Sequence, residues 1–239
     1  MKTTNRHTKQ IAPIAQASLP LLALIICALL EGSVVGAHAA AVIVPNSSFD
    51  TPTLADGGFG LPATSWTGAA VFNPQDAQFS GSSGSGNLPS PALGQQCAYL
   101  GSSSLGSLAT TSPLTNILAD TAYRLTVALG SRLDFPTDPI GTVTLSFLAN
   151  GTPIPGGSTT ITTNTTAISL GTFADFTTSF TTNASSPQIG QNLTASISYT
   201  GGRQVMIDNV RVDATAVPEP TSTILLASAL SFLWQRRRR

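Results

Sequence analysis

The residues able to do chemistry in this chain are few and of limited kinds. Between Ala40 and Ala216 the ionisable side chains are nine aspartates, four arginines, three tyrosines and the single cysteine Cys97. This segment has no lysine or glutamate, and both histidines precede it. Ser-His-Asp and Cys-His machinery and a zinc site of the usual type are therefore excluded within it. A glycosidase would have to use two aspartates alone, held about 5–9 Å apart.

Two aspartates lie in distinctive motifs at opposite ends of this segment. Asp50 closes the motif Val44–Asp50, and Asp208 lies inside the motif Val205–Val212. Strict strand alternation in the second motif places Asp208 on the same face as apolar side chains. A charged carboxylate there needs a partner, so we expect either a β-bulge at Asp208-Asn209 or a bound cation. The alternative is a carboxylate that accepts hydrogen bonds from backbone N–H groups at a sheet edge.

Charge and cysteine content narrow the classes of function. Four arginines against nine aspartates give the segment a net charge of −5, which does not provide the basic surface that nucleic-acid binding requires. Cys97 cannot form a disulfide within the segment. It lies in the alternating stretch Gln95–Leu100, so we expect a small buried hydrophobic side chain rather than a reactive thiol.

The pattern of the segment predicts an all-β fold. Threonine, serine, glycine and proline are abundant, and apolar and polar residues alternate over residues 123–129, 143–149 and 193–199. Asn150-Gly151 and Gly201-Gly202 are turn signals. Further strands are expected at Val42–Val44, Trp66–Phe72, Gln95–Leu100, Phe176–Phe180 and Val205–Val212. Short strands with no helical stretch between them predict a β-sandwich, with long loops at Ser80–Pro91 and Arg132–Pro139.

The two aspartate motifs together resemble those of galactose-binding-like jelly rolls, the fold of many carbohydrate-binding modules. The resemblance implies that the first and last strands lie side by side. It also implies a structural calcium ion tying them together, with Asp50 and Asp208 as the acidic ligands. Sugar platforms need exposed aromatic faces, yet we expect Tyr123, Tyr199 and Trp66 to lie in the core. A specific glycan ligand is thus implied by the resemblance alone.

The first 39 residues have the organisation of a signal peptide. A basic start containing Lys2 and Arg6 precedes the apolar run Leu19–Leu30. Ala37-His38-Ala39 then has the small-x-small spacing of a cleavage site. We therefore expect residues 1–39 to be removed by a cut after Ala39, with Ala41 as the alternative site.

The C-terminal residues 217–239 combine three parts in a fixed order. Pro218-Glu219-Pro220 is followed by the apolar run Thr221–Gln235 and by Arg236-Arg237-Arg238-Arg239. This order resembles the PEP-CTERM sorting signal, which implies cleavage by an exosortase. The run would span about 22 Å as a helix at ~1.5 Å per residue, less than the ~30 Å of a hydrocarbon core. We expect a short transmembrane helix, held transiently in the inner membrane with its arginines on the cytoplasmic side.

These observations predict three parts: a signal peptide (1–39), a jelly-roll β-sandwich (40–216) and a sorting signal (217–239). The expected function is that of an exported, non-catalytic protein, structural or adhesive in an extracellular polysaccharide matrix, secreted or at the cell surface. A carbohydrate-binding module with a defined glycan is one alternative. A hydrolase that uses aspartates alone is another.

Overall fold

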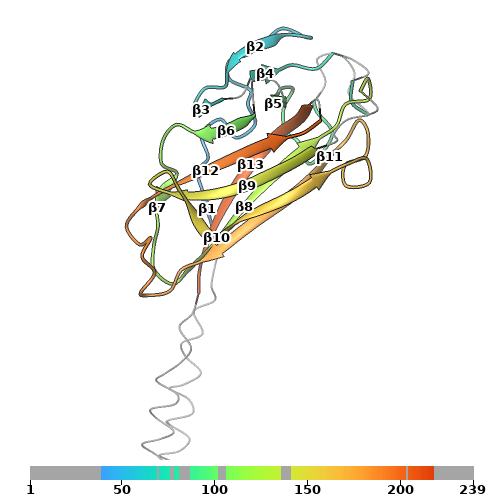
Figure 1. Cartoon of the computed structure of the whole chain (residues 1–239). Coiled ribbons are helices and arrows are strands. Elements are labelled where there is room, and N and C mark those ends of the chain that lie inside the picture. The colour runs from blue at the N-terminus through green and yellow to red at the C-terminus, as the bar shows by residue number, and fades with distance from the viewer. Residues whose placement is uncertain are drawn as a thin grey trace, which may run out of the picture. The chain divides into compact units, whose positions relative to one another are not determined.

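The computed structural model describes residues 39–217, apart from residues 69, 76–77, 81–86, 102–105, 136–140 and 203. Within these ranges the chain forms two antiparallel sheets that pack face to face, and it contains no helix (Figure 1). The predicted all-β sandwich is confirmed. The expected signal helix and C-terminal hydrophobic helix lie outside the described residues. No helix in the described part is long and apolar enough to cross a membrane.

The larger sheet brings the first and last strands of the fold together. Its strand order is β11-β8-β13-β5-β4-β2, and β1 pairs with β13. The resemblance to galactose-binding-like domains predicted this pairing. The strands are β11 (Phe173–Thr181), β8 (Thr121–Gly130), β13 (Gln204–Ala216), β5 (Cys97–Gly101), β4 (Ala70–Phe72), β2 (Phe59–Pro62) and β1 (Ala39–Val42).

The smaller sheet has the order β10-β9-β12-β6-β3, with β7 paired to β12. Its first hairpin turns at Asn150-Gly151, where φ is 47° and 82°, as a two-residue turn between twisted strands requires. The predicted turn is therefore confirmed. The strands are β10 (Thr152–Thr163), β9 (Gly141–Ala149), β12 (Asn192–Thr200), β6 (Ser107–Thr110), β3 (Trp66–Thr67) and β7 (Thr115–Asn116).

One predicted strand, Trp66–Phe72, is wrong as a single element. Its first part is β3 in the smaller sheet, and its last part is β4 in the larger sheet. Gly68 separates them with a φ of +82°, and a Cβ there would lie 2.1 Å from the carbonyl oxygen of Ser107. The chain crosses between the two sheets at Gly68. Glycine is needed there, because a residue with a side chain would be strained by the positive φ and would clash with Ser107.

The main core fills the space between the two sheets. Tyr123, Tyr199 and Trp66 all belong to it and are at most 2% exposed. Trp66 Nε1 donates a hydrogen bond to the carbonyl oxygen of Pro45, which satisfies its polar end. The prediction that these aromatic residues are core is confirmed, so none of them offers an exposed face to a sugar.

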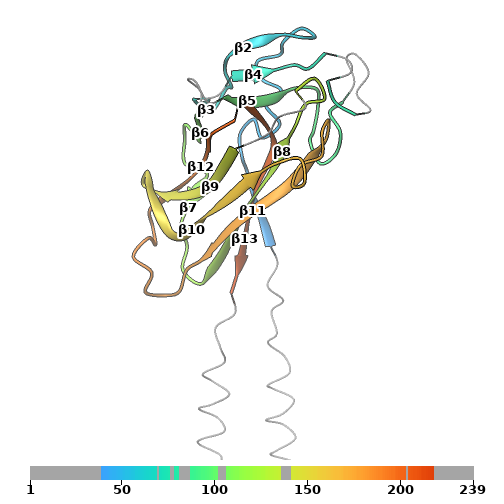
Figure 2. The ribbon, with the colours of Figure 1, turned by 45° about the vertical axis from the view of Figure 1, so that its right-hand side comes forward.

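A second apolar cluster covers the outer face of the larger sheet. We call it the outer cluster; its buried members are Phe72, Phe79, Leu88, Ala92, Cys97, Ala128, Phe173 and Met206, with half-buried Tyr99 packed against them. Loop residues Phe79, Leu88 and Ala92 cover strand residues. Figure 2 shows β2, β4 and β5 together at one end of the sandwich. The cluster extends the apolar packing of the fold to this outer face, beneath the covering loops.

Candidate active site

Strand β13 places three side chains on the outer face of the larger sheet. Gln204, Met206 and Asp208 share this face, because the residues between them, Val205 and Ile207, belong to the main core. On one side, β5 pairs with β13 from Gln204 to Ile207. On the other side, β8 pairs with β13 from Met206 to Asp208. The carboxyl of Asp208 therefore lies on the face that the outer cluster covers.

A β-bulge follows Asp208, as the sequence predicted. The pairing of β13 with β8 shifts register after Asp208, and Asn209 has a φ of +44°. Asn209 Nδ2 donates a hydrogen bond of 2.6 Å to the carbonyl oxygen of Pro91. The bulge returns Val210 and Val212 to the main core while Asp208 stays outside it. The expectation of an edge strand is wrong, because β13 lies between β8 and β5.

Asp208 is fully buried and has one free carboxyl oxygen. Its Oδ2 accepts a hydrogen bond of 2.5 Å from the backbone N–H of Leu93, whereas its Oδ1 has no partner among the described residues. Burial raises the pKa of Asp208 to about 8, although the N–H groups of Leu93 and Asn209 oppose the shift. The negative charge of Asp50 is a smaller contribution to the same rise. With a pKa of about 8, the protonated form of Asp208 predominates at neutral pH.

Asp50 also binds the loop segment that contains Leu93. Its Oδ2 accepts a hydrogen bond of 2.8 Å from Ser48 Oγ, and its Oδ1 accepts longer bonds of 3.3 and 3.4 Å from the backbone N–H groups of Gln95 and Gln96. Together the two aspartates bind the backbone from Leu93 to Gln96. The structure thus brings together the two residues that the sequence singled out.

The partners of these two carboxylates among the described residues are hydrogen-bond donors. Calcium takes six to eight oxygen ligands, whereas Asp50 and Asp208 accept hydrogen bonds from the backbone N–H groups of Leu93, Gln95 and Gln96. No group of three or more His, Cys, Asp or Glu side chains that could hold a metal occurs in the described ranges. Asp50 and Asp208 match the other alternative from the sequence, that of carboxylates accepting backbone N–H groups.

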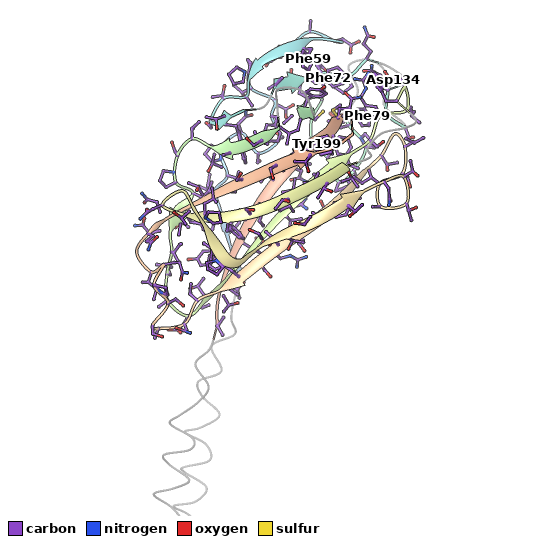
Figure 3. All side chains as sticks on the ribbon, in the orientation of Figure 1. Phe59, Phe72, Phe79, Asp134 and Tyr199 are labelled. Atoms are coloured by element: carbon purple, nitrogen blue, oxygen red, sulfur yellow. The ribbon has the colours of Figure 1, made fainter. Side chains whose placement is uncertain are left out.

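Aromatic side chains gather around the outer cluster. Phe59 is 57% exposed, and its ring meets that of Tyr99 edge-on at 5.2 Å. The guanidinium of Arg132 lies 4.8 Å from the ring of Phe72 and 4.6 Å from that of Phe135. Figure 3 shows Phe59, Phe72 and the loop residue Asp134 at the same end of the fold. Of these rings, Phe59 is the exposed one, Tyr99 and Phe135 are half-buried, and Phe72 is buried.

Cys97 belongs to the outer cluster and is fully buried. Burial raises the pKa of its thiol well above the ordinary value. The thiol is therefore neutral. The prediction of a small buried hydrophobic side chain is confirmed.

A buried carboxyl with a raised pKa beside an apolar cluster marks Asp208 as a candidate functional residue. Residues 40–213 match the model of the HpiC1-like family, described as HpiC1 cyclase. The chain belongs to this family. No curated protein sequence matches it.

Several solved structures share this fold. A cyclase from Fischerella sp. TAU superposes with a TM-score of 0.60 at 20% identity, covering 76% of this chain and all of that one. A Stig cyclase from the same source, in complex with (3Z)-3-(1-methyl-2-pyrrolidinylidene)-3H-indole, gives 0.59 at 20% identity, covering 76% and 100%. A cyclase in complex with 4-(1H-indol-3-yl)butan-2-one gives 0.59 at 20% identity, covering 75% and 99%.

These findings correct the function expected from the sequence. A non-catalytic structural or adhesive role, with glycan binding as its alternative, is wrong, because the family is one of cyclases. The absence of histidine and glutamate from this segment does not exclude catalysis, because a buried aspartic acid can donate a proton. Of the expected processing residues, Ala39 begins β1. Ala37, Pro218, Glu219, Pro220 and Arg236–Arg239 lie outside the described residues.

Proposed function

We propose that this protein is a cyclase in which Asp208 donates the proton that starts ring closure. The observation that carries this proposal is the buried carboxyl with a pKa of about 8 and a free Oδ1. A proton passes from Oδ1 to a π-bond or imine nitrogen of the substrate. The resulting cation is attacked by another π-bond of the same molecule, and a carbon–carbon bond closes the ring. Loss of a proton from the product to the carboxylate restores the acid.

The proposed substrate is an indole with an unsaturated side chain. Two similar cyclases are described in complex with indole compounds. In this chain Phe59 and Tyr99 offer aromatic faces, which attract a flat ring and stabilise a cation that forms beside it. An indole reacts as an electron-rich π-system, which is the type of substrate that a proton donor in an apolar site activates.

Each neighbouring group has a task in this proposal. The N–H of Leu93 fixes Oδ2 and leaves Oδ1 for the substrate. The outer cluster excludes water, which keeps the carboxyl protonated and protects the cation from hydration. Asp50 holds the segment that carries Leu93, through the N–H groups of Gln95 and Gln96.

The test uses the purified protein and a panel of 3-alkenyl indoles. Cyclisation leaves the molecular mass unchanged, so products are separated by chromatography and their rings are identified by NMR. We expect wild-type protein to form a cyclic isomer and Asp208→Asn to form it at least ~100-fold more slowly. Asp213→Asn, a half-buried aspartate on the same strand, is the matched control and should keep the activity. Equal rates in wild type and Asp208→Asn would refute the role of Asp208.

Calcium is the competing occupant of the same carboxyl. An ion held by Asp50 and by Oδ1 of Asp208 would require Asp208 to be ionised and would stabilise the folded state. Free calcium at 100 times its dissociation constant would add ~2.7 kcal/mol of stability. Melting the protein with calcium and with a chelator separates the two proposals. A calcium-dependent rise that Asp208→Asn abolishes would favour the ion over the proton.

We further propose that the enzyme is exported and processed at its C-terminus. Support comes from the sequence: the signal-like residues 1–39, and the Pro-Glu-Pro, apolar and arginine parts of residues 217–239. An exosortase in the inner membrane would cut near Pro218-Glu219-Pro220, leaving the protein secreted or at the cell surface. Intact-mass measurement of protein from the native host tests this. A mass that still includes Arg236–Arg239 would refute it.

A further inference from the structure

Two buried side-chain atoms lack a hydrogen-bond partner in the described part of the chain. One is Oδ1 of Asp208, and the other is the amide Nε2 of Gln204. Gln204 is only 7% exposed. A buried amide without an acceptor destabilises a fold, so native proteins rarely contain one without a functional reason. The role proposed for Asp208 leaves Gln204 unexplained.

Both atoms belong to the same face of the same strand. Gln204 and Asp208 are the first and fifth residues of β13, and Met206 between them is a member of the outer cluster. Their Cα atoms are therefore about 13 Å apart at ~3.3 Å per residue.

The neighbouring strands add little bulk beside Gln204. It lies opposite Gly101 of β5, which contributes no side chain to this face. Met206 is opposite Gly130 of β8, over which the ring of Phe173 is packed. Gln204 thus lies at the end of the face away from the acid, beside a residue that has no side chain.

We propose that Gln204 is a substrate-binding residue, whose amide N–H donates a hydrogen bond to an acceptor oxygen or nitrogen on the substrate's side chain. This inference rests on the proposed cyclase function and narrows its substrate class. The substrate carries both a π-system within reach of Asp208 and a hydrogen-bond acceptor at its other end. Gln204 sets which end faces the acid, so it determines the orientation in which the ring closes.

The test compares two probes that differ only in the acceptor: 4-(1H-indol-3-yl)butan-2-one and 3-butylindole. Their dissociation constants are measured by calorimetry with wild-type protein and with Gln204→Met, which keeps the length of the side chain and removes the donor. We expect wild-type protein to bind the ketone about fivefold more tightly, the ratio that one hydrogen bond supplies. In Gln204→Met this ratio falls to about one, and the affinity for 3-butylindole is unchanged.

Gln191→Met is the matched control, because its amide bonds the carbonyl oxygen of Pro187 at the surface. It should keep the wild-type ratio. Three results would overturn the inference: wild-type protein that binds both probes equally, wild-type protein that binds neither, or Gln204→Met that keeps the preference for the ketone. Thermal melting adds a readout without ligand. We expect Gln204→Met to melt no lower than wild type, whereas a fall of several degrees would show a structural role and also overturn it.

The outcome is separable from that of the proposed acid. If Gln204→Met behaves as expected while Asp208→Asn still cyclises the alkenyl indoles at the wild-type rate, the role of Asp208 fails and that of Gln204 stands. If Asp208→Asn is inactive and Gln204→Met keeps the ketone preference, the role of Asp208 stands and that of Gln204 fails.

Discussion

Gly94 lies directly against the carboxylate of Asp50. A Cβ at Gly94 would come within 2.3 Å of Asp50 Oδ2, and the φ of Gly94 is +69°. Glycine is required here for two reasons, the close approach and the left-handed backbone. Because Leu93 is the preceding residue, this contact also fixes the N–H group that binds Asp208.

We therefore expect Gly94→Ala to lower both stability and activity. The left-handed backbone costs about 1 kcal/mol for alanine, and the clash with Asp50 adds to it. Gly190→Ala is the control, since Gly190 has a φ of +79° but nothing within 4 Å of its added Cβ. Urea unfolding should show a larger loss for Gly94→Ala. Equal losses in the two variants would mean that the contact with Asp50 contributes nothing.

The pH dependence of turnover should follow the protonated form of Asp208. With a pKa of about 8, the carboxyl is an acid at neutral pH and becomes a carboxylate above pH 8. We expect kcat/KM for cyclisation to be level between pH 6 and 7 and to fall tenfold per pH unit above about 8. A rate that instead falls through pH 4 would indicate an ordinary carboxylate acting as a base.

Removing the charge of Asp50 should move that profile. Asp50 raises the pKa of Asp208, although less than burial does. In Asp50→Asn we expect the midpoint of the pH profile to shift toward lower pH while the plateau rate changes little. Asp175→Asn, whose carboxylate pairs with Arg211 at a half-exposed position, is the comparison. A midpoint that stays at its wild-type value would show that Asp50 acts only by holding the loop.

Stability should fall as pH rises, and Asp208 should be the cause. Its pKa is higher in the folded state than the ordinary 3.8, so the folded state binds more protons than the unfolded state between pH 4 and 8. The contribution of Asp208 is thus fully present below pH 4 and is lost as pH approaches 8. We expect Asp208→Asn to be more stable relative to wild type at pH 8 than at pH 5. Urea unfolding at both values measures this, and an equal difference at each would contradict it.

Much of the fold could be predicted from sequence, because alternation records which side chains face the core. The bulge at Asp208-Asn209 was predictable for the same reason. Strict alternation would place the charged side chain of Asp208 among apolar side chains, and a bulge removes that conflict. The division of Trp66–Phe72 was missed, because its only signal was Gly68 within an apolar run.

The outer cluster could not be predicted in the same way. Its covering residues Phe79, Leu88 and Ala92 come from loops rich in glycine, serine and proline, where no periodicity reports burial. The raised pKa of Asp208 depends on its burial beneath these loops. Composition alone therefore predicted a non-catalytic protein. Tyr99 and Met206, which alternate with core residues on neighbouring strands, were the available signal for a second buried face.

Strand β13 changes partners at the position of the acid. On one side it pairs with β5 from Gln204 to Ile207 and with β1 from Val212 to Thr215, while β8 runs along the other side. The residues from Asp208 to Arg211 lie in the gap between the two partners, where Val210 N–H bonds the carbonyl oxygen of Ser47 instead. Along that edge, the two halves of β13 therefore pair with different strands. Fraying at the C-terminal end of β13 would loosen its pairing with β1 and with the first residues of β8, whereas the half that carries Asp208 would keep its pairing with β5 and with the last residues of β8.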